Sequence, residues 1–527
     1  MGRRKNLLLG SLSIGIALSG LSCIEPAQDV SNVSSESNFK KGKPEQKNIR
    51  WVGHNDLQAR SAYQPTIQKQ GNRYIAYVGH HTGLVLNPLN GVTEFSGTSI
   101  VDVTDPRRPQ YLAHIPGVDA VAGGFSESGG AQMTRVCSGD VLPQGTPGKV
   151  YLLRSLGSIS HQIWDVTNPA SPSLLSTVMS GLTNTHKNFW ECETGIAYLV
   201  AGAGAGSPNP DGWKVNQHMV VYNLANPAAP QYIRDFGMAG TNPTSALPVP
   251  AGASLHGPIS VPGKNRIYLA MGVNRSGNIQ ILDRSKVLPP PWGTAVISDP
   301  VRPTDAELQA AQLGLLQMPS DAGAHTTFPV FDVPLPAFAN HTNPRAGLRN
   351  LIVMVSESFN ARCQDFPQLA SIIDATEEKR MWPLSTMMVD ERTGNPPFCS
   401  RGARFAAHSS NESFYAPWYG KLIATSWFNA GTRIWDIRDP YHPQEVAYFI
   451  PPANDKTSLS CAPGSNPPSD CKANIMTNNV ELDDRGLIYA VDRANSGMDI
   501  LSLSGSAANI VSPNSYGSYH DLNGDED

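Results

Sequence analysis

Short apolar runs, each ended by turn-forming residues, make up most of the chain. In the clearest pattern, a run with β-branched or aromatic residues leads to an Asp-Pro or Asn-Pro pair, a second Pro and another apolar run. Copies of this pattern occupy residues 99–115, 162–178, 219–236 and 432–449. Asp or Asn before Pro favours a turn, and Pro cannot donate a hydrogen bond within a sheet. Each copy therefore predicts a hairpin of two short strands.

A second apolar pattern precedes the hairpins and predicts one further strand in each unit. Its seven copies lie at residues 71–81, 148–155, 195–202, 264–272, 349–357, 420–427 and 485–492. In three units the pattern of the third strand is degenerate, at residues 277–285, 385–393 and 497–505. Seven units within residues 52–510 have about 65 residues each, so some of them must carry insertions. The clearest insertions are residues 286–324 and 358–384.

Repeated strand units without helical crossovers predict an all-β fold in which small antiparallel sheets pack around one axis. We therefore expect a seven-bladed β-propeller over residues 52–510, with a pair of β-sandwiches as the alternative. Two weak helical patterns, at residues 304–317 and 365–380, fall inside the insertions. They predict inserted loops that carry short helices.

The N-terminus has the pattern of an export signal. Basic residues at positions 3–5 precede an apolar segment, residues 7–21, which is too short and too rich in Gly and Ser to span a membrane comfortably. Small residues before Cys23 suggest that residues 1–23 are a lipoprotein signal, with Cys23 acylated after cleavage. Gly20 stands where such signals usually carry Leu, so ordinary cleavage is the alternative.

The rest of the composition fits an exported protein. Residues 24–50 are polar and predict a flexible linker, and residues 511–527 predict a polar tail. The formal net charge of −4 gives no basic field for nucleic acid, so nucleic-acid binding is not expected. Localisation in the periplasm or on the cell surface is expected instead, with the membrane reached through the lipid on Cys23.

Six of the seven cysteines remain after Cys23 is set aside, an even number that suits disulfides in an oxidising compartment. The first two occupy matching places in adjacent units, the next two border the insertion at 358–384, and the last two flank a short loop. Buried free thiols are the alternative, and the connectivity stays open. The six are Cys137, Cys192, Cys363, Cys399, Cys461 and Cys471.

The repeated hairpin pattern, two hydrophobic residues, Asp, a hydrophobic residue and then Asp-Pro with a second Pro, resembles that of the LVIVD-repeat proteins. The resemblance runs from about residue 52 to 505 and is strongest over residues 399–452. These proteins are exported bacterial propellers, so the resemblance implies the fold and the location. It implies no particular chemistry, because the family has no agreed general activity.

Five units offer a histidine upstream of the second pattern, where the innermost strand of each blade is expected. In two of them, the histidine lies twelve residues before the Tyr of the second pattern. Equivalent positions of all blades form a ring around the central channel, and converging imidazoles on rigid strands suit copper, zinc or iron. Alternatively, these side chains bond only to buried water and backbone carbonyls. The candidate ligands are His54, His186, His256, His325 and His408.

Other polar residues close to these positions are candidate companions. A carboxylate or amide there would orient an imidazole or accept a proton, although Glu412 and Glu481 also fit solvated loop charges. These companions are Glu357, Asn411, Glu412 and Glu481. Trp427, Arg433 and Arg493 would line a mouth for an anionic or aromatic ligand, or simply pack between blades.

Two kinds of function agree with this pattern. One is an envelope propeller that binds a transition metal through axial histidines. The other is a non-catalytic surface module that binds a protein, a glycan or a small molecule on one face. A metal-dependent oxidase is a third reading, by analogy with selenium-binding proteins, whose own motifs are not matched here. No catalytic residue follows from the sequence.

Overall fold

The computed structural model describes residues 42–120, 128–202, 212–273, 275–334, 347–360, 363–364, 368–460 and 472–512. The chain divides into two units, Met1–Val33 and Ser34–Asp527, and all described residues belong to the second. The predicted signal with Cys23, and the tail from residue 513 on, lie outside them. Among the described residues, no helix has the length and apolar character needed to cross a membrane.

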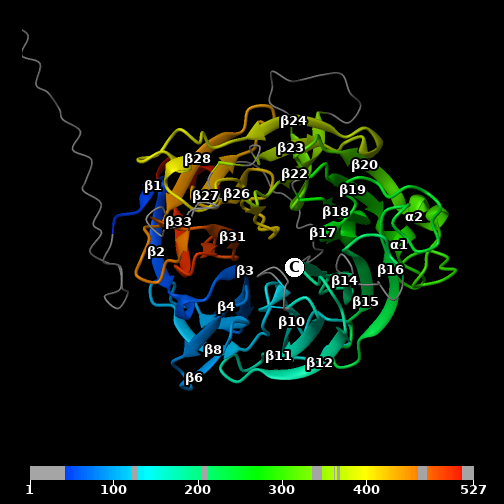
Figure 1. The fold of residues 1–527 in the computed structure, drawn as a ribbon, viewed down its shortest axis with the longest axis horizontal. Helices are drawn as coiled ribbons and strands as arrows, with labels where there is room; N and C mark the ends of the chain where they lie inside the picture. Colours follow the sequence, from blue (N-terminus) through cyan, green and yellow to red (C-terminus); the bar gives the residue numbers. More distant parts are fainter. Residues whose placement is uncertain are drawn as a thin grey trace, which may run out of the picture. The chain divides into compact units, whose positions relative to one another are not determined.

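The second unit is a seven-bladed β-propeller, as predicted. Seven antiparallel sheets of four or five strands lie around one axis (Figure 1). From the innermost strand outward, blade 1 has β3 (Ala62–Gln70), β4 (Arg73–His80), β7 (Thr98–Asp102) and β8 (Gln110–Ile115), and blade 2 has β9 (Thr134–Ser138), β10 (Val150–Leu156), β11 (Ser160–Asp165) and β12 (Ser173–Ser180). Blade 3 has β13 (Asn188–Trp190), β14 (Ile196–Ala201), β15 (His218–Asn223) and β16 (Gln231–Phe236). Blade 4 has β17 (Leu255–Val261), β18 (Arg266–Met271), β19 (Asn278–Asp283) and β20 (Gln312–Gln317).

The remaining blades complete the ring. Blade 5 has β21 (Thr326–Pro334), β22 (Leu348–Val355), β23 (Ala370–Asp374) and β24 (Trp382–Met387). Blade 6 has β25 (Ser409–Ser410), β26 (Leu422–Trp427), β27 (Gly431–Asp436) and β28 (Gln444–Ile450). Blade 7 has β31 (Thr477–Leu482), β32 (Ile488–Asp492), β33 (Met498–Leu503) and β2 (Ile49–Asn55). The additional elements are the hairpins β5 (Leu84–Asn87) with β6 (Val92–Phe95) and β29 (Leu459–Ser460) with β30 (Lys472–Ala473), and the helices α1 (Arg284–Val287), α2 (Asp305–Ala311) and α3 (Gly505–Ile510).

The ring is closed by the N-terminal part of the second unit. Strand β2 is the outermost strand of blade 7 and pairs with β33, the last strand of the chain among the described residues, so an early and a late segment share one sheet. Just before it, β1 (Glu45–Lys47) adds a fifth strand to blade 6, with Glu45 opposite Ile450. Residues 45–50, predicted as part of the linker, are therefore mostly strand, and the propeller begins earlier than residue 52.

The outer hairpin of every blade carries a β-bulge at the same place. In blades 1 and 6, for example, the register shifts between Ile100 and Val101 and between Ile434 and Trp435. Blade 7 has its shift between Trp51 and Gly53 of β2. A bulge adds local twist. The shared position explains why the same hairpin pattern recurs in the sequence.

The helix predicted over residues 365–380 is wrong. Ala370–Asp374 forms β23, the third strand of blade 5, and only Glu378–Arg380 makes a short 3-10 turn. Asp374 accepts a hydrogen bond from the Thr376 backbone at 2.9 Å, as Asp102 at the end of β7 does from the Thr104 backbone. Glu377-Glu378 stands where other blades have Asp-Pro or Asn-Pro, which hid the hairpin pattern. The strand predicted at 385–393 is instead mostly the loop after β24.

The helix predicted over residues 304–317 is half correct. Helix α2 starts at a capping box between Thr304 and Glu307 and ends at Ala311. The following residues, Gln312–Gln317, form β20, the fourth strand of blade 4. The insertion predicted at 286–324 thus contains a regular blade strand as well as the helix.

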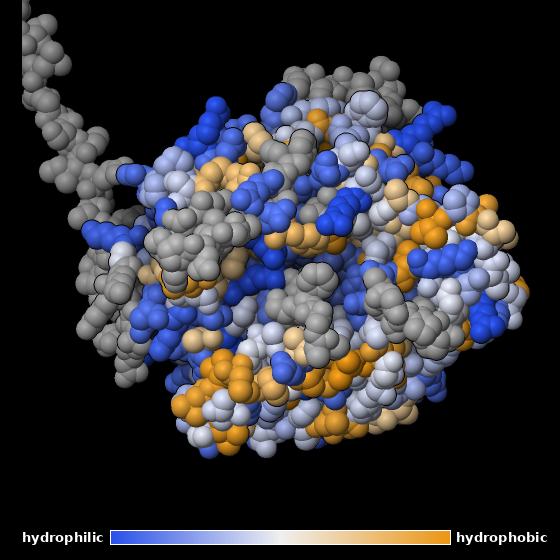
Figure 2. Space-filling view, viewed as in Figure 1, coloured by the Kyte–Doolittle hydropathy of each residue, from blue (hydrophilic) through white to orange (hydrophobic). Residues whose placement is uncertain are grey.

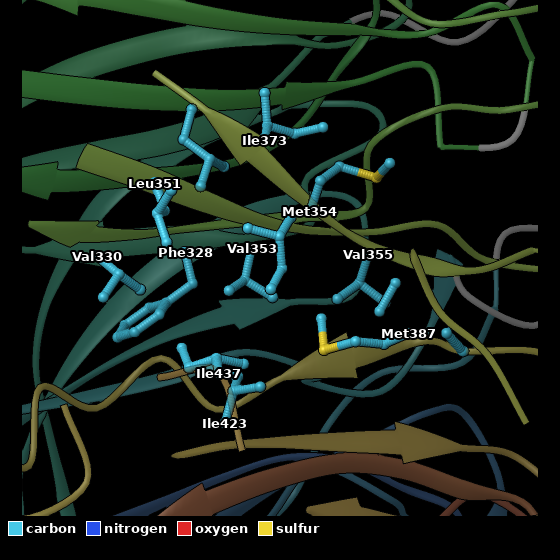
Figure 3. Close-up of a cluster of buried hydrophobic side chains, with 14 of the residues drawn as sticks. Phe328, Val330, Leu351, Val353, Met354, Val355, Ile373, Met387, Ile423 and Ile437 are labelled. Atoms are coloured by element: carbon cyan, nitrogen blue, oxygen red, sulfur yellow. The ribbon is translucent and has the colours of Figure 1, made fainter. Parts of the chain in front are cut away.

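The hydrophobic core lies between neighbouring blades. Figure 3 shows part of its largest cluster, in which Phe328 of β21, Val353 of β22 and Met387 of β24 face Ile423 of β26 and Ile437. All five side chains are at most 2% exposed. Burial of an aliphatic or aromatic side chain of this size contributes about 1.5–3 kcal/mol. The blades are thus held by side-chain packing, which keeps the inner strands in place around the axis.

The face seen in Figure 2 separates apolar from polar surface. Hydrophilic residues lie around the centre of the ring, and hydrophobic residues gather along the edge where Figure 1 places β6, β8, β11 and β12. Exposed aliphatic side chains on the β5–β6 hairpin and β12 include Leu84, Leu86, Val92 and Leu174. The central part of this face is therefore the polar one.

Four of the six candidate cysteines form two disulfides. Cys137 bonds to Cys192, and Cys363 bonds to Cys399. The first bond ties β9 of blade 2 to the loop after β13 of blade 3. Cys461 and Cys471 lie outside the described residues.

Replacing both Cys137 and Cys192 by Ser is expected to lower the free energy of unfolding by about 2–4 kcal/mol. The bond closes a loop of 55 residues, so its removal gives the unfolded chain more conformational freedom. Urea unfolding of the oxidised protein and of the double variant would measure the change. Equal stability of the two proteins would contradict the expectation.

Candidate metal centre

Four of the five predicted histidines lie together at the axis. His186, His325 and His408 directly precede or lie near the start of the inner strands β13, β21 and β25, and His256 lies within β17. Each comes from a different blade, and all four are buried. The repeat places them because equivalent residues of inner strands face the same central channel.

The imidazoles contact one another in sequence around the axis. Nε2 of His186 lies 2.9 Å from Nε2 of His256. The ring centre of His256 lies 4.0 Å from that of His325, which lies 4.2 Å from that of His408. Four imidazoles from blades 3 to 6 therefore form one cluster.

Backbone carbonyls fix the tautomers of two of these rings. Nδ1 of His256 lies 2.8 Å from the carbonyl oxygen of His325, and Nδ1 of His408 lies 2.6 Å from that of Asn478. A carbonyl only accepts, so both Nδ1 atoms must donate. Nδ1–H donation to a carbonyl is the usual arrangement behind a histidine that ligates a metal through Nε2.

Burial keeps these rings neutral. It lowers the pKa of His256, His325 and His408 well below the usual value, and neighbouring positive or imidazole groups lower it further. A neutral ring with its proton on Nδ1 has a bare lone pair on Nε2. Nε2 of His408 has no hydrogen-bond partner among the described residues, although it is fully buried. Such an atom carries a lone pair that a metal ion in the channel could accept.

Glu357, which follows β22, is the companion that the structure brings to the cluster. Its carboxylate oxygens lie 3.6 Å from Nε2 of His408 and 4.0 Å from Nε2 of His325. Arg404 donates to it at 3.0 Å, and Arg493 lies at 3.9 Å. The predicted mouth residue Arg493 is therefore at the site.

The cluster offers a set of donors that suits a transition metal. His256, His325 and Glu357 each offer one ligand atom, and these three atoms lie within 4.8 Å of one another. Imidazole nitrogens with a carboxylate oxygen are ligands of zinc, copper and iron in proteins. His186 and His408 extend the set from either side.

His54 does not join this cluster. It lies in β2, the outermost strand of blade 7, where Nδ1 contacts Asp499 at 2.8 Å. Trp51 donates to the same carboxylate at 2.9 Å. The alignment that included His54 was wrong because it took β2 as the start of the first blade rather than as the end of the last.

Tyr63 occupies the place that the sequence assigned to His54. It lies in β3, the inner strand of blade 1, and its hydroxyl is 3.1 Å from Nε2 of His186 and 3.3 Å from Nε2 of His325. The prediction missed it because only histidines were sought at this position. Alignment of the inner strands, with β3 just before the pattern at 71–81, would have found it.

A second buried cluster of charged residues lies nearby. Glu412 pairs with Lys187 at 2.9 Å and with Arg135, and the Glu412 backbone donates to Glu481. Asn411 accepts from the backbone of β26, at Ala424, at 2.9 Å. Glu412 and Glu481 are both buried, so their reading as solvated loop charges is wrong.

The two carboxyl groups are in opposite protonation states near neutral pH. Burial raises the pKa of Glu412, but Lys187 and Arg135 outweigh it and hold the pKa at about 2. Burial raises the pKa of Glu481 to about 8, and the charge of Glu412 adds to this. The sequence did not predict Lys187 or Arg135, although Lys187 directly follows His186 in the chain.

The native protein should lose folding stability as the pH rises and Glu481 gives up its proton. Glu481→Gln is expected to abolish this pH-dependent loss. Because the pKa of Glu481 is raised on folding, its stabilising contribution to the free energy of unfolding is complete below about pH 4.5 and is lost between about pH 4.5 and 8. Gln has no proton to lose, so the variant should gain relative stability by up to about 1.4 kcal/mol per pH unit in this range. Urea unfolding at pH 5, 6.5 and 8 would measure the difference, and a constant difference would contradict it.

The other two predicted mouth residues pack inside the protein. Trp427 is fully buried and donates to Thr425 at 3.0 Å. Arg433 pairs with Glu445 at 3.0 Å and stacks on Tyr448 with 4.8 Å to the ring centre. Both match the alternative that they serve packing.

Comparison with known proteins finds no relative in sequence and only distant likeness in structure. No model of a protein family matches the chain, and no curated protein matches it. Among solved structures, Raptor from Chaetomium thermophilum is similar at 10% identity and a TM-score of 0.46, over 87% of this chain and 30% of that one. Sqt1 of the same organism, bound to the N-terminus of ribosomal protein L10, matches at 11% and 0.42, over 87% of this chain and 100% of that one. Likeness at this level says nothing of function.

Proposed function

We propose that this protein is a β-propeller that binds one transition metal ion, copper, zinc or iron, at its axis. The ligands would come from His186, His256, His325 and His408, with Glu357 beside them. The observation that carries the proposal is the pair of Nδ1 donations from His256 and His408 to backbone carbonyls. These bonds leave Nε2 lone pairs turned into a buried cluster, for which a cation is the natural partner.

The distance between two nitrogens of the cluster agrees with ligation of one ion. Nitrogen ligands lie about 2.0–2.1 Å from zinc, so two ligands at angles of 90–110° lie about 2.9–3.4 Å apart. Nε2 of His186 and Nε2 of His256 are 2.9 Å apart. A direct N–H···N hydrogen bond has the same length, and metal analysis separates the two arrangements.

We also propose that the protein works outside the cytoplasm, held at the membrane by a lipid on Cys23. The N-terminal signal pattern and the disulfides Cys137–Cys192 and Cys363–Cys399 support this, because disulfides persist in oxidising compartments. Fractionation of cells that express the chain, with a Cys23→Ala variant as control, would test it. Release of the variant from the membrane fraction is the expected result.

Metal analysis tests the main proposal. The purified protein would be stripped with a chelator and then titrated with Cu(II), Zn(II) and Fe(II) or Fe(III), with bound metal measured by elemental analysis. About one ion per chain is expected for at least one metal, together with a higher melting temperature, because an ion that binds only the folded state stabilises it. Binding of less than a tenth of an ion for every metal would contradict the proposal and leave a module that binds through its faces.

A further inference from the structure

Tyr63 is the member of the axial cluster that is not an imidazole. It comes from β3 of blade 1, whereas the histidines come from blades 3 to 6, and it is 1% exposed. Blade 1 is adjacent to none of those four blades. Its ring meets those of His186 and His408 edge-on, with centres 5.3 and 5.8 Å apart. The phenol therefore reaches across the axis into the cluster.

The hydroxyl of Tyr63 lies at ligand spacing from two imidazoles. Its distances to Nε2 of His186 and of His325 are 3.1 and 3.3 Å. The distance between Nε2 of His186 and Nε2 of His256 is 2.9 Å. All three values fall in the range of about 2.9–3.4 Å that separates ligands of one ion.

Separate hydrogen bonds, each with its own proton, cannot fill all three contacts. Nε2 of His256 is bare, because Nδ1 carries the proton. If Nε2 of His186 is protonated and donates to His256, it has no lone pair with which to accept from Tyr63. If it is bare, it accepts from Tyr63 but faces the bare nitrogen of His256. With two protons for three contacts, His186 would have to share its Nε2 proton between His256 and Tyr63, whereas one cation at the centre would satisfy all three.

We propose that the phenolate oxygen of Tyr63 is a ligand of the axial ion, an inference that rests on the proposed metal binding. On binding, the metal–oxygen bond forms and the phenol proton leaves to solvent, with no change in oxidation state. A phenolate is an anionic oxygen donor and complements neutral imidazoles at an oxidised ion. The centre is therefore suited to Fe(III) or Cu(II) more than to a metal that prefers neutral nitrogen donors alone.

Visible spectroscopy tests the inference directly. The purified protein loaded with Fe(III) or Cu(II) should show a phenolate-to-metal charge-transfer band, with phenolate ring vibrations enhanced in resonance Raman spectra. Tyr63→Phe should lose the band, and Tyr63→His should lose it while still binding the ion through a substitute imidazole. Tyr77→Phe is the matched control, since Tyr77 is a buried tyrosine of β4 in the same blade, and it should keep the band.

The outcomes separate the inference from the function on which it rests. Loaded native protein without the band, or a band that persists in Tyr63→Phe and Tyr63→His, would overturn the role of Tyr63 and leave the metal site standing. Native protein that binds no ion would overturn both. Circular dichroism of each variant would show that it is folded.

Discussion

Replacement of His256 by Ala is expected to weaken metal binding by at least about 100-fold, so that the purified variant holds almost no ion. His256 lies between His186 and His325, and its Nδ1 bond to the His325 backbone aims Nε2 at the centre. The change removes both a ligand and the contact that orders its neighbours. Elemental analysis and a competitive titration with a chelator would measure the loss.

The control for this variant is His54→Ala. His54 is also a largely buried histidine with a short bond, to Asp499, but it lies in β2 at the outside of blade 7. It should therefore cost some stability and leave the metal content at the native level. Equal metal content in the two variants would show that the axial histidines do not bind the ion.

Replacement of Glu412 by Gln is expected to lower the free energy of unfolding by about 3–5 kcal/mol at pH 7. The change leaves Lys187 and Arg135 without their shared carboxylate, and Lys187 is only 3% exposed in its side chain. The pairs join blades 2, 3 and 6 across the channel, so the loss should appear as a lower midpoint of urea unfolding.

The pH dependence gives this prediction a second readout. Because the pKa of Glu412 is lowered to about 2, its contribution is present above about pH 4.5 and is lost as the pH falls towards 2. The difference between native and variant protein should shrink over that interval. The control is Asp439→Asn, which removes an exposed pair with His442 and should cost less than about 1 kcal/mol. A similar loss in both variants would contradict the role of Glu412.

The number of blades could be predicted because the outer hairpin is a local structure. Its turn residues, Asp or Asn before Pro, mark the end of the third strand in the sequence itself. Where Asp-Pro is replaced, as by Glu377-Glu378 in blade 5, the turn still forms, with the Arg380 backbone donating to the Glu377 carbonyl, but the pattern no longer marks it. Ring closure by β2 was missed for a different reason, since its partner β33 lies more than 440 residues away and no local signal joins them.

The axial site was partly predictable for a related reason. Repeat alignment places equivalent inner-strand positions around one channel, and this was enough to bring His186, His256, His325 and His408 together. It placed His54 where Tyr63 lies, because only histidines were sought and β2 was taken as the start of the first blade. Nor could it predict that Lys187 reaches Glu412, since the contact joins residues 225 positions apart through a long side chain.

Closure of the ring through β2 and β33 also sets an order of events as the chain is made. β2 is among the first parts of the propeller to be synthesised, yet it has to wait for residues 498–503 before its sheet exists. Until then blade 7 lacks its outer strand, and the seven inner strands have no closed ring to hold them at a common distance from the axis. If the axis binds the proposed ion, its histidines would reach a fixed spacing only in the closed ring, so a chain cut short before β33 is expected to hold the ion less tightly.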